Sequence, residues 1–100
     1  MTDERVFTWV EAHRKLPIHH FYASSVAQAE AIPRSIVRES LSEMVKTGTL
    51  RIAGWEVDCP VCSETVDVRT PSGEAECQRC GEVWDYTEAT TITQYAFPKP

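Results

Sequence analysis

Hydrophobic residues in the first part of the chain follow helical spacing, with one extended interruption. In residues 4–15, "ERVFTWVEAHRK", they recur near one helix face: Val6, Phe7, Val10 and Ala12 or His13. This pattern predicts a first helix, which Pro17 ends because proline lacks the backbone N–H that a helix needs. Residues 18–24, "IHHFYAS", alternate enough to predict a short strand or an extended link.

Two more helices and a strand are predicted after this link. Residues 25–32, "SVAQAEAI", carry small apolar side chains, and Ser24 or Ser25 can cap their helix. The next helix, "PRSIVRESLSEMVKTG" (33–48), begins with a proline and stops at a glycine, as helices often do. Its core face is predicted at i, i+4 and i+7: Val37, Leu41 and Met44, with Ile36 and Val45 beside them. The stretch "TLRIAGWEV" (49–57) is β-like.

Short strand-like runs fill the remainder of the chain. The runs "ETVDVRT" (64–70) and "EAEC" (74–77) are joined by "PSG", a turn-forming cluster, so they are predicted to pair as a hairpin. A third strand is expected in "EVWDYT" (82–87), where aromatic side chains should cover a small core. A last one is expected in "TTITQYAF" (90–97), which is rich in β-branched and aromatic residues.

All four cysteines lie in two Cys-x-x-Cys turns, "CPVC" and "CQRC", with fourteen residues between Cys62 and Cys77. Two thiolates of each turn can point at one ion, while backbone N–H groups stiffen the sulfurs. The spacing predicts one tetrahedral zinc ion on Cys59, Cys62, Cys77 and Cys80, with iron or a redox disulfide as the alternatives. Four protein ligands leave no open position, so this zinc would be structural. Gly81 follows the second pair, where a positive φ is often needed.

The arrangement of the cysteine segment within the chain has two solutions. Only Asp58 separates the predicted strand from Cys59, so no flexible linker lies between them. In the favoured solution, residues 50–57 and 91–97 pair as antiparallel strands and the cysteine segment is inserted between them. In the other, a tight hairpin turns at Ala53-Gly54 and the cysteine segment is appended after it.

Composition and cysteine use indicate a soluble intracellular protein. The chain has 100 residues, of which 42% are hydrophobic and 25% charged, and no apolar run could span a bilayer. The N-terminal sequence "MTDERVF" lacks the features of a signal peptide, so a cytoplasmic location is expected, with no membrane partner. In a reducing compartment, paired cysteines are more often metal ligands than disulfides.

Charge is uneven along the chain. Residues 1–57 contain seven basic and seven acidic residues, whereas residues 58–100 contain three basic and eight acidic ones. Four thiolates around a Zn²⁺ ion would add two more negative charges. A phosphate backbone would therefore be repelled by the C-terminal part.

The segment "SSVAQAEAIPRSIVRESLSEMVKTGTLRI" resembles a winged helix-turn-helix domain, which would cover residues 1–57 in an α+β fold. A helical hairpin without a recognition role is the alternative. The cysteine segment, residues 58–90, resembles a zinc ribbon with four cysteine ligands, and residues 91–100 would form a C-terminal strand returning to the wing. This domain order is similar to that of the archaeal general transcription factor E family, in which both modules dock on RNA polymerase.

Two functional hypotheses follow. The first is a zinc-binding winged-helix adaptor that docks on a larger protein complex, with a role in transcription implied by the resemblance. The second is a sequence-specific DNA-binding regulator, dimeric through its first helix. For either, the candidate contact residues on the second helix of the motif and on the wing are Arg34, Ser35, Arg38, Arg51 and Trp55. The sequence pI of about 5.1 favours the adaptor.

Catalysis is not expected. The sequence contains no nucleophile motif, phosphate loop or open metal site. Its three histidines, His13, His19 and His20, are interpreted as isolated surface residues, because no carboxylate or cysteine partner is placed beside them by the sequence. We therefore expect a non-enzyme.

Overall fold

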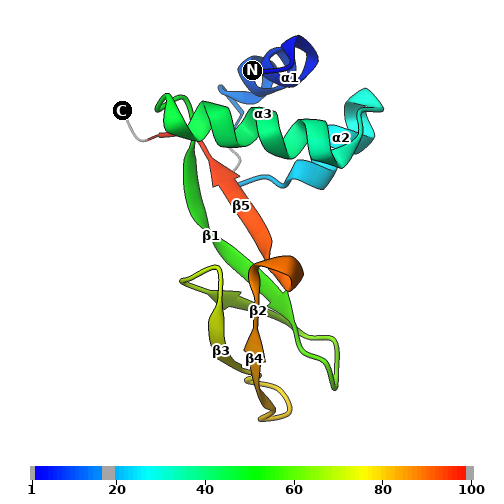
Figure 1. The fold of residues 1–100 in the computed structure, drawn as a ribbon, viewed down its shortest axis with the longest axis vertical. Coiled ribbons are helices and arrows are strands. Elements are labelled where there is room, and N and C mark those ends of the chain that lie inside the picture. The colour runs from blue at the N-terminus through cyan, green and yellow to red at the C-terminus, as the bar shows by residue number, and fades with distance from the viewer. Residues whose placement is uncertain (1, 17–19, 99–100) are drawn as a thin grey trace. The chain divides into compact units, whose positions relative to one another are not determined.

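The computed structural model describes residues 2–16 and 20–98, and its fold is α+β, as predicted (Figure 1). Three helices come first: α1 (Glu4–His13), α2 (Ala23–Glu30) and α3 (Arg34–Lys46). Five strands follow: β1 (Arg51–Asp58), β2 (Thr65–Val68), β3 (Gly73–Glu76), β4 (Val83–Tyr86) and β5 (Ile92–Ala96). A 3₁₀ turn, η1 (Glu88–Thr90), precedes β5. Pro17, Ile18 and His19 lie outside the described residues, so the predictions made for them are not addressed.

The chain divides into two compact units. Unit 1 comprises Met1–Ala53 and Tyr95–Pro100, and unit 2 comprises Gly54–Gln94. The first unit contains the three helices, and the second contains the two cysteine pairs. Both boundaries fall inside strands, within β1 and within β5.

The core of unit 1 is built by the apolar faces of the helices. The predicted α3 face is confirmed, since Val37, Leu41 and Met44 are all buried. On α1 the buried residues are Val6, Trp9 and Val10, which follow i, i+3, i+4 spacing.

Phe7 departs from the prediction. It was expected in the core, but it is 47% exposed. One position after Val6, its side chain lies about 100° around the helix, beyond the edge of the buried stripe. Trp9 is the aromatic residue of α1 that packs in the core instead, with its ring centroid 5.1 Å from the ring centroid of Phe21.

Helix ends follow the sequence signals in α3 and differ from them in α2. Gly48 has a φ of +81°, and the chain closes there by a bond from the Thr49 N–H to the Met44 carbonyl oxygen at 2.9 Å. For α2 the predicted serine cap is wrong, because the helix begins at Ala23 and Tyr22 precedes it with no side-chain cap bond. The serines lie inside the first turn.

Strand pairing in unit 2 differs from the predicted hairpin. Residues 64–70 and 74–77 do not pair with each other: β2 pairs antiparallel with β1, and β3 pairs antiparallel with β4. Each Cys-x-x-Cys segment lies in the connection, 59–64 or 77–82, that joins the two strands of a pair. The "PSG" cluster therefore connects two sheets, with orders β2-β1-β5 and β3-β4.

The small core of unit 2 is apolar and partly aromatic. Val57, Ala75 and Tyr86 are buried in it, and the half-buried Val66, Val68 and Trp84 pack against them. The prediction that Trp84 and Tyr86 cover this core is confirmed. The Tyr86 hydroxyl donates a hydrogen bond to the carbonyl oxygen of Thr70 at 3.0 Å, which satisfies its polar end.

β1 runs unbroken through Ala53 and Gly54, where the alternative wing arrangement required a turn. β5 lies beside β1 in the sheet (Figure 1). Within residues 2–16 and 20–98, no helix has the length and apolar character needed to cross a membrane.

Candidate metal centre

The two cysteine turns have the same backbone construction. In the first, the Cys59 N–H donates to the Glu64 carbonyl oxygen at 2.9 Å, and the Ser63 N–H donates to the Cys59 carbonyl oxygen at 2.9 Å. In the second, the corresponding bonds run from Cys77 to the Glu82 carbonyl oxygen and from Gly81 to the Cys77 carbonyl oxygen, both at 2.8 Å. Each pair of strands thus ends in a knuckle that presents two sulfurs.

The residue after each knuckle has a positive φ. Gly81, where this was predicted, has a φ of +79°. Ser63 occupies the equivalent place in the first knuckle with a φ of +64°. Serine rarely adopts this conformation, so no sequence signal marks Ser63; only the equivalence of the two knuckles reveals it.

The four sulfurs are brought together as a tetrahedral site requires. The Sγ atoms of Cys59 and Cys80 are 3.6 Å apart, those of Cys62 and Cys77 are 3.5 Å apart, and all four lie within 4.8 Å of one another. A Zn–S bond of about 2.3 Å in tetrahedral geometry corresponds to sulfur separations of roughly 3.8 Å. A disulfide would need about 2.05 Å, so both sulfur pairs are thiols.

Burial and acidity differ among the four thiols. Cys59 and Cys77 are buried, whereas Cys80 is exposed. The Cys80 backbone N–H lowers the pKa of the Cys77 thiol to about 7, because it stabilises the thiolate. The Glu82 backbone N–H acts in the same direction on Cys80, but partial desolvation of its sulfur and the three neighbouring thiols together raise the pKa of Cys80 to about 12. A bound cation favours the thiolate form of its cysteine ligands, so metal binding to this cluster would release protons.

A second polar cluster in unit 2 was not foreseen from the sequence. Gln94 is 8% exposed, and its Nε2 donates to Glu56 Oε2 at 2.6 Å and to Asp67 Oδ1 at 3.2 Å. Beside it, a Cβ added to Gly54 would meet the Gln94 Oε1 atom at 3.1 Å. This cluster joins residues of three strands, β1, β2 and β5.

The candidate contact residues are distributed over both units. Arg34, Ser35 and Arg38 are exposed on α3, as predicted, and Arg51 is exposed on β1. Trp55 is half-buried on β1 in register with Val68.

The two described histidines contact aromatic residues. The His13 ring stacks on Trp9 with 3.8 Å between centroids, and its Nδ1 lies 2.7 Å from the Trp9 carbonyl oxygen. The His20 Nε2 lies 3.0 Å from the Tyr22 hydroxyl. These contacts hold the rings in place, and neither ring lies among the clustered metal-ligand candidates.

No protein-family model matches the chain, and neither the curated proteins nor the solved structures give a significant match. The geometry itself supports a small α+β domain whose three helices precede antiparallel strands, with a four-cysteine cluster that suggests a zinc ribbon.

Proposed function

We propose that the protein is a zinc-binding winged-helix adaptor that docks on a larger protein complex. The observation that carries the zinc assignment is the closed set of four sulfurs, all within 4.8 Å of one another at the ends of two equivalent knuckles. The residues that would hold the ion are Cys59, Cys62, Cys77 and Cys80.

The ion's role in this proposal is structural. Four sulfur ligands fill a tetrahedral shell, which leaves no coordination position for water or substrate. Unit 2 has a core of only three buried apolar residues besides its cysteines, Val57, Ala75 and Tyr86. A structural zinc typically contributes about 10–16 kcal/mol of apparent binding energy to folding, and units with so small a core usually depend on such a contribution. The adaptor role proposed for the chain is non-enzymatic.

The winged-helix interpretation is supported by the order of elements. The last of the three helices, α3, is followed by a glycine turn, and β1 then enters an antiparallel sheet. The domain order is similar to that of the archaeal general transcription factor E family, which supports a setting in transcription.

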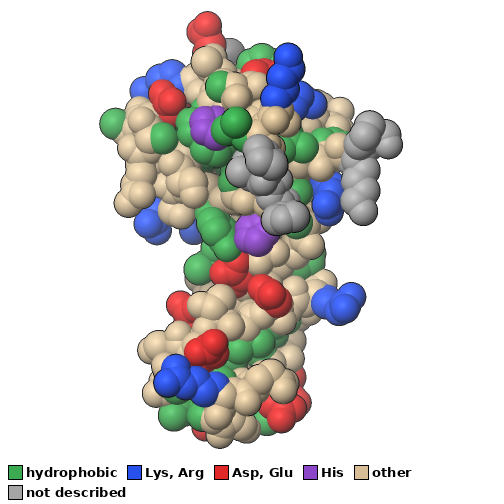
Figure 2. All heavy atoms as spheres, turned by 180° about the vertical axis from the view of Figure 1, so that it is seen from behind, with side chains coloured by type: hydrophobic (Ala, Val, Ile, Leu, Met, Phe, Trp, Pro, Cys, Tyr) green, Lys and Arg blue, Asp and Glu red, His purple; other side chains and the backbone are tan. Residues whose placement is uncertain are grey.

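The adaptor interpretation is supported by charge. Unit 2 contains nine acidic and two basic residues, a net charge of −7 before any metal thiolates are counted. Figure 2 shows acidic side chains on the visible face of this unit, with only isolated basic ones. Such a field repels nucleic acid and attracts basic protein surfaces.

One observation favours a second candidate, a DNA-binding regulator. Arg34, Ser35 and Arg38 are all exposed at i, i+1 and i+4 on α3, as side chains that contact DNA from a recognition helix must be.

DNA selection decides between the two candidates. The zinc-loaded protein is incubated with a randomised duplex pool at two salt concentrations, alongside Arg34→Ala/Arg38→Ala. Lys15→Ala/Lys46→Ala serves as the control because it removes the same charge from two other exposed positions. The adaptor should show only non-specific affinity, about 10⁻⁴–10⁻⁶ M at physiological salt. Enrichment of one motif that is lost in the arginine variant and kept in the lysine variant would instead establish the regulator.

A further inference from the structure

The four cysteines of the metal centre form two pairs that each combine an accessible sulfur with a buried one. The Sγ atoms of Cys59 and Cys80 are 3.6 Å apart, and those of Cys62 and Cys77 are 3.5 Å apart. Cys59 and Cys77 are 2% and 1% exposed, whereas Cys80 is exposed and Cys62 is half-buried. Each contact therefore places an accessible sulfur of one knuckle against a protected sulfur of the other.

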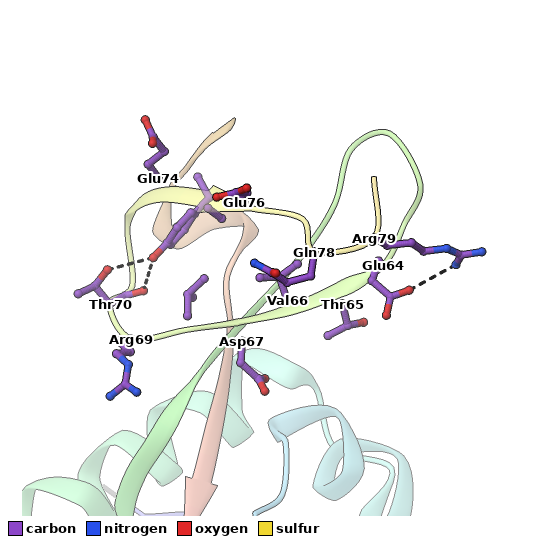
Figure 3. Close-up of a pocket in the computed structure, with 13 residues that line it drawn as sticks. Glu64, Thr65, Val66, Asp67, Arg69, Thr70, Glu74, Glu76, Gln78 and Arg79 are labelled. Carbon is purple, nitrogen blue, oxygen red and sulfur yellow. Dashed lines mark hydrogen bonds and ion pairs between the residues drawn. The ribbon is translucent and has the colours of Figure 1, made fainter. Parts of the chain in front are cut away.

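The tip of the second knuckle is open to solvent around Cys80. Residues 78–81 are all exposed, and a Cβ added to Gly81 would meet no atom within 4 Å outside its chain neighbours. Figure 3 shows the side chains of Gln78 and Arg79 beside an open groove of about 770 Å³, whose lining includes residues of β2 and β3. A small oxidant dissolved in water can therefore reach the Cys80 sulfur without any opening of the fold.

A pair of sulfurs arranged in this way can be oxidised in two steps. The thiolate is the form of cysteine that both binds a metal ion and attacks a peroxide. Attack on hydrogen peroxide gives a sulfenic acid, which condenses with a nearby thiol to a disulfide. An S–S bond of about 2.05 Å requires the observed sulfurs to approach by about 1.5 Å, a shift that rotation of the cysteine side chains can supply.

We infer that the metal centre is also a peroxide-sensitive switch, in which Cys80 is oxidised first and Cys59 resolves the product. In the first step the Cys80 thiolate attacks hydrogen peroxide, the O–O bond breaks, and one oxygen leaves as water after taking a proton from solvent. In the second step the Cys59 sulfur attacks the Cys80 sulfur, the S–S bond forms, and the sulfenic oxygen leaves as a second water with another solvent proton. The two sulfurs together lose two electrons, which the peroxide gains.

The disulfide removes two of the four metal ligands. Only Cys62 and Cys77 then remain as thiolates, and two ligands do not complete a tetrahedral zinc site. Cys77 does not compete with Cys59 for the oxidised sulfur, because its own sulfur contacts Cys62. The metal is therefore released on oxidation, and a dithiol reductant that cleaves the disulfide restores the site. This inference rests on the zinc proposed above and makes the metal content of unit 2 respond to oxidants.

The test uses the full zinc-loaded chain, one equivalent of hydrogen peroxide and a chromophoric chelator that reports released zinc. One equivalent of peroxide should release one equivalent of zinc, because each peroxide molecule forms one disulfide. Peptide mapping under non-reducing conditions should find Cys59 joined to Cys80. When dimedone, which traps sulfenic acids, is present during the reaction, its adduct should be found on Cys80. Dithiothreitol and added zinc should restore the original metal content.

Histidine substitutions remove one thiol and keep a zinc ligand, because sites with three cysteines and one histidine are also tetrahedral. Cys80→His should lose the rapid zinc release, since the accessible sulfur of its pair is gone. The matched control, Cys62→His, leaves the other pair intact and should release zinc as rapidly as the native chain. Cys59→His should increase the dimedone adduct on Cys80, because the sulfenic acid loses its resolving partner. Each variant is first shown by elemental analysis to bind one zinc, and the mapping on the native chain depends on no variant.

Several results would overturn the switch. These are retention of zinc after oxidation, a first disulfide within one knuckle or between two chains, and equal release rates in Cys80→His and Cys62→His. A zinc-loaded chain that resists peroxide would leave the structural zinc and the adaptor proposal standing. A chain that contains no zinc before oxidant is added would instead refute the zinc assignment, and this inference with it.

Discussion

Replacing Leu41 by alanine tests whether the face of α3 that carries Leu41 packs in the core of unit 1. Leu41 has no exposed surface and lies in the cluster formed by the three helices. The substitution deletes three buried carbon atoms, worth about 0.8 kcal/mol each by transfer, and leaves a cavity that adds to the cost. We expect a loss of about 3–4 kcal/mol, within the range of about 2–5 kcal/mol usual for a core leucine. A unit of this size has a stability on the order of 3–9 kcal/mol, so the loss is a large fraction of it.

The assay is urea unfolding of the zinc-loaded protein, followed by far-ultraviolet circular dichroism. All three helices belong to unit 1, so the helical signal reports on that unit alone. The control is Ser42→Ala, at the next position on α3, where the side chain is exposed. It should change the free energy of unfolding by no more than about 0.5 kcal/mol. A similarly small change for Leu41→Ala would show that the buried face of α3 has been assigned incorrectly.

Three further predictions concern the metal, the backbone of the knuckles and the charge of the Asp3 carboxyl. Elemental analysis after dialysis should find one zinc per chain. Cys62→Ser should lose both the metal and the native amide NMR spectrum of unit 2. A folded, metal-free Cys62→Ser variant would contradict a structural zinc. Gly81→Ala should weaken zinc affinity, because alanine in the left-handed region costs about 1–2 kcal/mol, while Ser63→Gly at the equivalent place should preserve or raise zinc affinity. Competition with a chromophoric chelator measures both affinities. A loss of affinity in Ser63→Gly as large as that in Gly81→Ala would refute the equivalence of the knuckles. The bond from Arg5 lowers the pKa of the Asp3 carboxyl, so its contribution to stability is present above the unfolded value of about 3.9 and is lost as pH falls through the folded value. Asp3→Asn should therefore melt at a lower temperature than the native chain near neutral pH, and this difference should shrink in acid; a constant difference would exclude a charge effect.

Features that depend on neighbours along the chain could be predicted from the sequence alone. The face of α3 that carries Leu41 could be predicted because helical periodicity places residues four apart on one side whatever they pack against. The stop at Gly48 could be predicted because a positive φ is a local property of glycine. The four-cysteine cluster could be predicted for a similar reason, since each Cys-x-x-Cys turn places two sulfurs close together by local geometry. One contact between the two turns then brings all four sulfurs into a single site.

Strand partners and free surfaces, in contrast, depend on the folded chain. The "PSG" cluster has the composition of a hairpin turn, yet in the folded chain the strand pairs are closed by the cysteine knuckles, and β2 pairs with β1 and not with β3. Phe7 has the hydrophobicity of a core residue, but the volume beside Phe21 is filled by Trp9. Periodicity and composition encode how one segment is shaped. The choice of strand partner depends on contacts between residues distant in sequence, and so it is decided only in the tertiary structure.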